Sequence, residues 1–295
     1  MKPLVLYCKS YRTDLKRVIR LAKSIREFNT ENLPFFISVP KSDLQLFKQH
    51  LDDSNVEIIA DEEIVAKALS PEIERLAKLP GSISQQVVKS EFWRLGISAS
   101  YLCIDSDSLF IRPFGLSDFL TPEGTPYTMI DEGRSLLDDA LLNKKPRILK
   151  EFIHEAGLVQ DIFARKGKRY SFGPFPVVWH RNVWESLCKE YLETRKINLV
   201  DAIVLAPIES RWYGEALLKF AAIPLIPCQP LFKVYHYAWQ LDHDLRARIG
   251  NSQLADLYLG VIYQSAWERE MDWPREGGSL LSHIARRIRR QLGRN

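Results

Sequence analysis

The sequence predicts an α/β fold with a mainly parallel sheet and helices on both faces, and three observations support this class. Short apolar runs have the length of strands, at residues 3–8, 34–40, 56–60 and from Tyr101 onward. Between the first two runs, apolar residues from Leu15 to Ile25 recur at helical spacing. The composition, 46% hydrophobic and 26% charged over 295 residues, is that of a globular chain. Strands that alternate with helices favour parallel pairing, and ligands of such sheets bind beyond the carboxyl ends of the strands.

Two aspartates follow the fourth apolar run. Asp105 and Asp107 come directly after Tyr101–Ile104, and the apolar pattern then resumes. If the strand continues through them, both side chains point to the same face, where they repel each other unless a cation lies between them. Their oxygen atoms suit Mg²⁺ or Mn²⁺, and Mg²⁺ usually also binds substrate phosphates. The alternative is an acidic turn, because Asp and Ser are common in turns.

A helix is expected immediately before this strand. Val88, Phe92 and Leu95 recur at helical spacing in residues 84–96, and Gly96 is a typical helix stop. A basic helix leading into a strand with Asp-x-Asp resembles the metal-dependent glycosyltransferases of the GT-A fold, whose metal binds the diphosphate of a nucleotide-sugar. More narrowly, the chain resembles bacterial glycosyltransferase-like proteins of lipopolysaccharide and capsule synthesis, including domain of unknown function 6492.

The resemblance implies a Rossmann-like GT-A domain over residues 1–240. Residues 1–115 would form the half that binds the nucleotide-sugar, and residues 116–240 the acceptor half. Residues 241–295 are expected to form a helical extension that ends in a basic amphipathic tail. The resemblance is strongest over residues 1–115 and weaker to about residue 240.

The resemblance also implies a donor site. Asp105 and Asp107 would bind Mn²⁺ or Mg²⁺, with His236 as a third ligand, although a histidine among aromatic residues is more often part of a core. The expected contacts with the nucleotide-sugar come from the end of the first strand, the first loop and the helix before the Asp pair: Tyr7, Lys9, Ser10, Tyr11, Arg12, Lys89 and Arg94, together with Asp105. The cations would bind phosphate and a tyrosine, Tyr7 or Tyr11, would stack on the base, but solvated cations are the alternative.

The acceptor site requires a base, at least in an inverting enzyme. Glu209 stands at a predicted helix start, where it is either a catalytic base for the acceptor hydroxyl or a cap stabilised by the helix dipole. Asp131, at the end of a predicted strand, and Glu215 are its rivals. The residues expected to shape the sugar pocket are Gly173, His180, Trp212 and Tyr213, although His180 is equally compatible with a buried histidine bonded to backbone. A functional base slightly favours inversion over retention.

The net charge of +4 comes from the end of the chain. Five arginines lie within residues 286–295, and the rest of the chain is close to neutral, which does not indicate nucleic-acid binding. In residues 280–295, apolar side chains at spacings of three and four face away from the arginines. This pattern predicts contact with an anionic membrane surface. A solvated terminus is the alternative.

These observations predict a cytoplasmic, Mn²⁺- or Mg²⁺-dependent glycosyltransferase. It would move a sugar from a nucleoside-diphosphate sugar to a glycan or lipid-linked glycan, at the inner face of the plasma membrane. No run reaches the roughly 18 apolar residues of a membrane span. A nucleotidyltransferase that uses the same Asp pair is the second interpretation, although the chain has no Gly-x-Gly-x-x-Gly or Walker loop. A non-catalytic glycan- or membrane-binding protein on a transferase fold is the third.

Overall fold

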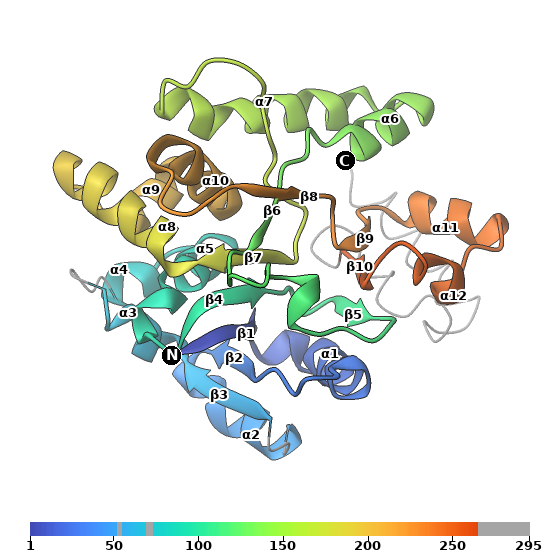
Figure 1. The fold of residues 1–295 in the computed structure, drawn as a ribbon, viewed down its shortest axis with the longest axis horizontal. Helices are drawn as coiled ribbons and strands as arrows, with labels where there is room; N and C mark the ends of the chain where they lie inside the picture. Colours follow the sequence, from blue (N-terminus) through green and yellow to red (C-terminus); the bar gives the residue numbers. More distant parts are fainter. Residues whose placement is uncertain (52–54, 69–72, 265–295) are drawn as a thin grey trace, which may run out of the picture.

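The computed structural model describes residues 1–51, 55–68 and 73–264, with a five-stranded sheet at the centre (Figure 1). The strand order is β3-β2-β1-β4-β7. These strands are β1 (Lys2–Lys9), β2 (Phe35–Val39), β3 (Val56–Ala60), β4 (Ser98–Cys103) and β7 (Val177–His180). Neighbours from β3 to β4 run parallel, whereas β7 runs antiparallel to β4. The predicted α/β class, with a mixed and mainly parallel sheet flanked by helices, is confirmed.

Helices cover both faces of this sheet (Figure 1). The α-helices of the described residues are α1 (Leu15–Phe28), α2 (Leu44–His50), α3 (Asp61–Val65), α4 (Ile73–Ala77), α5 (Gly81–Glu91), α6 (Arg134–Leu142), α7 (Pro146–Ile162), α8 (Arg181–Ser186), α9 (Leu199–Leu205), α10 (Glu209–Phe220), α11 (Ala238–Arg246) and α12 (Asn251–Leu254). Short 3₁₀ segments span Arg12–Asp14, Lys41–Asp43, Phe92–Leu95, Leu116–Asp118 and Glu193–Arg195, and Leu187–Leu192 is π-helical. None of the helices described is both long and apolar enough to cross a membrane.

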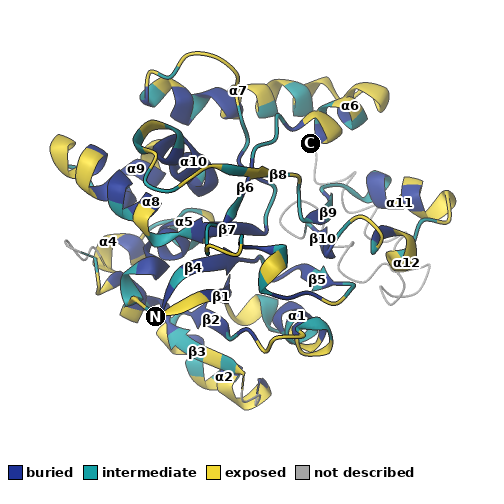
Figure 2. Cartoon of the chain, in the orientation of Figure 1, coloured by how far each residue is buried: buried dark blue, intermediate teal, exposed yellow. Residues whose placement is uncertain are grey.

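The core has two parts because strand side chains alternate between faces. In β1, Leu4 and Leu6 pack on the side of α1 and α2, while Val5 and Tyr7 pack on the side of α5, α8, α9 and α10. Figure 2 shows burial concentrated along the central strands and exposure on the outer faces of the helices. The four cysteines of the chain are free thiols.

Two smaller sheets extend the central one. A three-stranded sheet joins β5 (Ser108–Phe110), β10 (Gly260–Tyr263) and β9 (Phe232–Tyr235), and a parallel pair joins β6 (Tyr127–Met129) and β8 (Ile226–Cys228). The described part of the helical extension expected after residue 240 contains the end of α11 and the whole of α12, but also β10. β10 pairs with β5, the strand that follows the Asp pair, so the end of the described chain completes a sheet that begins at the predicted site.

Helix α6 was not predicted from the sequence. Residues 134–142, which form this helix, carry only a weak helical pattern. Only Leu136 and Ala140 of α6 are buried, so its apolar stripe is too narrow to produce a clear helical periodicity. The helix nevertheless matters, because its first turn lines a pocket of about 720 Å³.

The register of the sheet determines which loops meet. Tyr7 of β1 pairs with Cys103 of β4, and Lys9 pairs with Ser38 of β2. The carboxyl ends of these parallel strands therefore lie along one edge. This edge is where the sequence predicted a ligand site.

Candidate functional site

The Asp pair lies in a turn between β4 and β5. β4 ends at Cys103, and the backbone N–H of Ser108 donates to the carbonyl oxygen of Asp105 at 3.1 Å. The premise that one strand continues through both aspartates is therefore wrong, because the turn separates them. The Asp105 side chain is 25% exposed, whereas Asp107 is buried.

Asp105 belongs to a buried cluster with Lys89 and Glu209, which we call the lysine–carboxylate cluster. The Lys89 ammonium donates to Asp105 Oδ1 at 2.6 Å and to Glu209 Oε1 at 3.5 Å. It also lies 4.3 Å from the centroid of the Phe175 ring, a cation–π contact. Lys89 comes from the end of α5 and Glu209 from the first turn of α10, and both side chains are almost fully buried. Three residues that the sequence predicted separately thus meet in one place.

Burial and charge together determine the proton affinities in this cluster. Burial alone would lower the pKa of Lys89, but the charges of Asp105 and Glu209 raise it above its usual value, so the ammonium stays protonated. Burial raises the pKa of Glu209 above that of an ordinary carboxyl, although Lys89 opposes this shift. A carboxylate with a raised pKa is a better proton acceptor near neutral pH than an ordinary glutamate.

A pocket of about 720 Å³ adjoins the cluster. Its wall includes Ile208 and Ser210, the two neighbours of Glu209 in the chain, and Phe175, which contacts Lys89. Asp131, Gly173 and His236, which the sequence predicted as site residues, also line it. Its size falls within the range of small-molecule sites, which is about 300–1,000 Å³.

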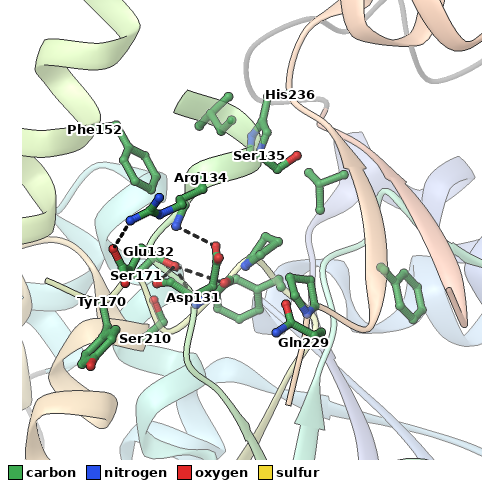
Figure 3. A pocket seen from close by; sticks show the side chains of 18 of the residues that line it. Asp131, Glu132, Arg134, Ser135, Phe152, Tyr170, Ser171, Ser210, Gln229 and His236 are labelled. Atoms are coloured by element: carbon green, nitrogen blue, oxygen red, sulfur yellow. Dashed lines mark hydrogen bonds and ion pairs between the residues drawn. The ribbon is translucent and has the colours of Figure 1, made fainter. Parts of the chain in front are cut away.

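Asp131 lies beyond the end of β6 and faces this pocket, as Figure 3 shows. Its Oδ2 accepts a hydrogen bond from the backbone N–H of Gly133 at 2.8 Å. Burial raises the pKa of its carboxyl, while the Gly133 N–H opposes the shift. Asp131 therefore remains the structural rival of Glu209 as a base. Glu215 is not a rival for this role, because Arg165 binds both of its oxygen atoms.

The two aspartates of the turn offer the oxygen donors that Mg²⁺ and Mn²⁺ prefer. In the part of the chain that the structure describes, however, no group of three or more His, Cys, Asp or Glu side chains is arranged to hold a metal ion. The predicted set of Asp105, Asp107 and His236 is thus not assembled. His236 lines the pocket instead, and burial lowers its pKa to about 4. Asp105 and Asp107 still fit Mg²⁺ chemically, because this ion is commonly bound by one or two carboxylates and completed by substrate phosphates.

The predicted phosphate-binding cations of the first loop are engaged by acids. Lys9 Nζ lies 2.7 Å from Asp61 Oδ2, and Arg12 binds Asp43 through its backbone and guanidinium. Ser10 is buried at the same edge of the sheet. These residues are where the sequence placed them, at the carboxyl end of β1, but a phosphate would have to compete with their present partners.

Arg94 is not at this edge. Its guanidinium pairs with Glu91, contacts Cys188 Sγ at 3.3 Å and stacks over Trp93. These contacts place it in a separate, smaller pocket. Its expected contact with the donor phosphates is therefore not supported, whereas Lys89, five residues earlier in the chain, does reach Asp105.

Three aromatic residues expected to contact ligand belong to the core. Tyr7 is fully buried and stacks on Phe92, with ring centroids 3.8 Å apart. Trp212 is fully buried, and its indole donates to a backbone carbonyl. Tyr213 is 2% exposed, and its hydroxyl accepts from the backbone N–H of His180. The expected stacking on base or sugar by these rings is wrong because no face of them is accessible, whereas Tyr11 is exposed.

His180 lies at the wrong end of the sheet for the predicted role. It pairs with Ser100, while Val177 pairs with Cys103, so the antiparallel β7 carries His180 away from the Asp pair. Its ring caps α8 by accepting from the backbone N–H of Asn182. Gly173 precedes β7 at the opposite end and therefore remains beside the pocket.

Arg211 lines the pocket and was missed by the sequence reasoning. It is 4% exposed, and within the described residues its Nε and Nη1 have no hydrogen-bond partner. A signal existed in its position beside the aromatic residues Trp212 and Tyr213, which follow Glu209. The sequence alone does not show that no acid accompanies it.

The predicted tail, residues 280–295, lies outside the described residues.

No curated protein matches this sequence significantly. Among solved structures, the apo crystal structure of mouse xyloside xylosyltransferase 1 is similar at 9% identity, with 90% of this chain and 98% of that chain covered and a TM-score of 0.44. The model of a family of unknown function, DUF6492, matches residues 3–240, which include the lysine–carboxylate cluster and the residues of the pocket up to Gln240. The chain therefore belongs to the DUF6492 family.

Proposed function

We propose that this protein is a glycosyltransferase that moves a sugar from a nucleoside-diphosphate sugar to a glycan or lipid-linked glycan of the bacterial surface. The observation that carries the proposal is the lysine–carboxylate cluster of Asp105, Lys89 and Glu209 at the carboxyl edge of the sheet, beside a pocket of about 720 Å³. The order of elements supports it as well, because a helix that carries a basic residue leads into a strand followed by Asp-x-Asp.

The cluster suits the chemistry of such a transfer. Glu209 would take the proton of the acceptor hydroxyl as its oxygen attacks the anomeric carbon and the nucleoside diphosphate leaves. Lys89 would keep Glu209 and Asp105 in position and offset their charges. Asp105 and Asp107 would hold a divalent cation, which supplies Lewis-acid neutralisation of the diphosphate when bound. Lys9, Ser10 and Arg12 remain candidates for phosphate contacts at the same edge.

A base at this position favours inversion of the anomeric centre. Glu209 is the first candidate, because it combines burial, a raised pKa and contact with the cluster. Asp131 is the second, because its carboxyl faces the pocket itself (Figure 3). The two are distinguished by the substitutions described in the Discussion.

Replacing Asp105 by asparagine is expected to remove most of the stabilisation by the donor. In a thermal-shift screen with Mn²⁺, the wild-type protein should be stabilised by a nucleoside-diphosphate sugar, by about 2–3 kcal/mol at a ligand concentration of 100 times Kd. Asp105→Asn should lose most of this shift, because one oxygen donor becomes a neutral amide. Asp118→Asn, which alters an acid that pairs with Arg112 elsewhere, serves as the control.

The same screen separates the proposal from its alternatives. Stabilisation by nucleoside triphosphates but not by diphosphate-sugars would instead indicate a nucleotidyltransferase. No response to either class would favour a binding protein without catalysis. An unchanged donor response in Asp105→Asn would exclude the Asp pair as the donor site.

We also propose that residues 280–295 bring the protein to an anionic membrane that holds the acceptor. A chain ending at residue 279 should no longer sediment with anionic vesicles, since the five arginines of the tail are lost. Binding of the full-length chain should weaken as salt rises, because charges are screened over about 8 Å at physiological ionic strength. Equal sedimentation of the truncated and full-length chains would show that the tail is not the anchor.

A further inference from the structure

The wall of the pocket contains a buried arginine that forms no ion pair with an acid in the part of the chain that the structure describes. Arg211 is 4% exposed, and within the residues described its Nε and Nη1 have no hydrogen-bond partner. Burial lowers its pKa to about 10, so the guanidinium stays protonated at neutral pH. A buried, charged donor without a partner is costly, and arginine is almost always paired when it is buried.

The acids nearest to Arg211 do not supply the missing partner. Glu215, one turn later in α10, is held by Arg165 through two hydrogen bonds of 2.6 and 2.8 Å. Glu155 of α7 acts on Arg211 only through its charge, without an ion pair between them in the described structure, and it is exposed. The Phe152 ring, at 5.8 Å from Arg211 Cζ, provides a weak cation–π contact. Among the described residues, no acid therefore satisfies Nε and Nη1 of Arg211, a residue of the pocket wall.

The other charged groups of the pocket that the structure describes form hydrogen bonds and ion pairs with partners other than Arg211. Glu132 is bound by Lys168 and Arg134, and the Asp131 carboxylate accepts from Gly133 N–H. Figure 3 shows Asp131, Glu132 and Arg134 close together at the pocket, with the ion pair between Glu132 and Arg134 drawn as a dashed line. Neutral hydrogen-bonding groups, Ser210 and Gln229 among them, line the rest of the polar surface.

We propose that the pocket binds an acidic sugar, whose carboxylate or phosphate is received by Arg211. The inference rests on the proposed function, since it specifies the acceptor class of the same site. The planar guanidinium presents parallel N–H donors that match the two oxygen atoms of such a group. Ser210 and Gln229 offer hydrogen bonds to hydroxyl groups of the sugar ring.

The proposal is tested by measuring the binding of D-glucuronate, glucose 6-phosphate and glucose in the absence of a nucleotide-sugar. By isothermal titration calorimetry, D-glucuronate or glucose 6-phosphate should bind at least 10-fold more tightly than glucose, and the stronger of the two distinguishes carboxylate from phosphate. Arg211→Met should weaken binding of the preferred acid roughly 10- to 100-fold and leave glucose unchanged. The affinity of Arg211→Lys for the preferred acid should lie between those of the wild type and Arg211→Met, because lysine keeps the charge but lacks the parallel N–H donors of the guanidinium.

Thermal stability distinguishes a binding role from a structural one. Without ligand, Arg211→Met should raise Tm by about 2–4 °C, because it removes an unpaired buried charge. Arg165→Met is the matched control and should lower Tm, since it leaves Glu215 buried without its partner. A fall in Tm for Arg211→Met comparable to that of Arg165→Met would overturn the proposal.

Equal affinity for acidic and neutral sugars would also overturn it. These outcomes are separable from the proposed function, because no donor or turnover is involved. If acids bind through Arg211 but no nucleotide-sugar stabilises the protein, the acid-binding site is supported and the proposed glycosyltransferase function is refuted. If a nucleotide-sugar stabilises the protein but acids bind no better than neutral sugars, the glycosyltransferase function is supported and the acid-binding site is refuted.

Discussion

Replacing Glu209 by glutamine is expected to reduce sugar transfer about 100- to 10,000-fold, the usual contribution of a general base. Glutamine has nearly the same shape but cannot accept the acceptor proton. The Lys89–Asp105 ion pair at 2.6 Å remains, so the fold should persist. In the wild-type enzyme, turnover should rise with pH as Glu209 deprotonates, above the range of an ordinary carboxyl because burial raises its pKa. Initial rates of transfer, measured as a function of pH, test both effects. In Glu209→Gln, the rise of the rate with pH that comes from Glu209 should be absent.

Two further substitutions locate the base. Glu215→Gln alters another buried acid of α10, but this acid pairs with Arg165 and should affect stability rather than the rate per folded molecule. Asp131→Asn should slow transfer less than Glu209→Gln. If Asp131→Asn removes the activity and Glu209→Gln does not, the base is Asp131. If neither does, the inverting assignment is wrong.

Replacing Lys89 by methionine is expected to lower the free energy of unfolding by about 3–5 kcal/mol, the usual cost of leaving a buried ion pair without one partner. The loss is large because Lys89 offsets two carboxylates at once. Glu209 is buried and Asp105 is three-quarters buried, so their mutual repulsion and desolvation would no longer be compensated. Urea unfolding of the two proteins at neutral pH measures the difference.

The chain offers a matched control for this experiment. Lys189 and Glu185 form an ion pair with the same N···O distance of 2.6 Å, but Lys189 is 64% exposed. Lys189→Met should therefore leave the stability nearly unchanged, because the pair is exposed to solvent. The double variant Lys89→Met/Glu209→Gln should recover part of the loss, since one unpaired charge is removed. A loss for Lys89→Met no larger than for Lys189→Met would show that the cluster is not electrostatically coupled.

The main sheet could be predicted because the patterns that indicate its strands and helices lie within short stretches of the sequence. The runs at residues 3–8 and 56–60 have the apolar length of buried strands, and the helical pattern between Leu15 and Ile25 implies a crossover between parallel strands. The strand at residues 260–263 was missed, since its partner β5 lies about 150 residues earlier. No local pattern identifies such a pairing.

Aromatic residues were the least predictable part of the site. Trp212 and Tyr213 follow Glu209 directly, and their position suggested a sugar platform. Burying a large aromatic ring stabilises the fold more than leaving it exposed to water, and both rings pack into the core. Whether a ring faces ligand or core depends on which neighbouring elements cover it, and these lie far away in the sequence.

The sequence by itself determined the type of sheet and the edge at which polar residues gather. Both follow from side-chain periodicity and from the rule that parallel strands end on one side. Only the tertiary structure decided which charges meet. Lys89 and Glu209 are 120 residues apart, yet they contact each other because α5 and α10 pack on the same face. It likewise decided that Arg165 pairs with Glu215 and that Arg211 has no acid bound to it among the described residues, since ion pairing inside a protein depends on distance and burial rather than on sequence spacing.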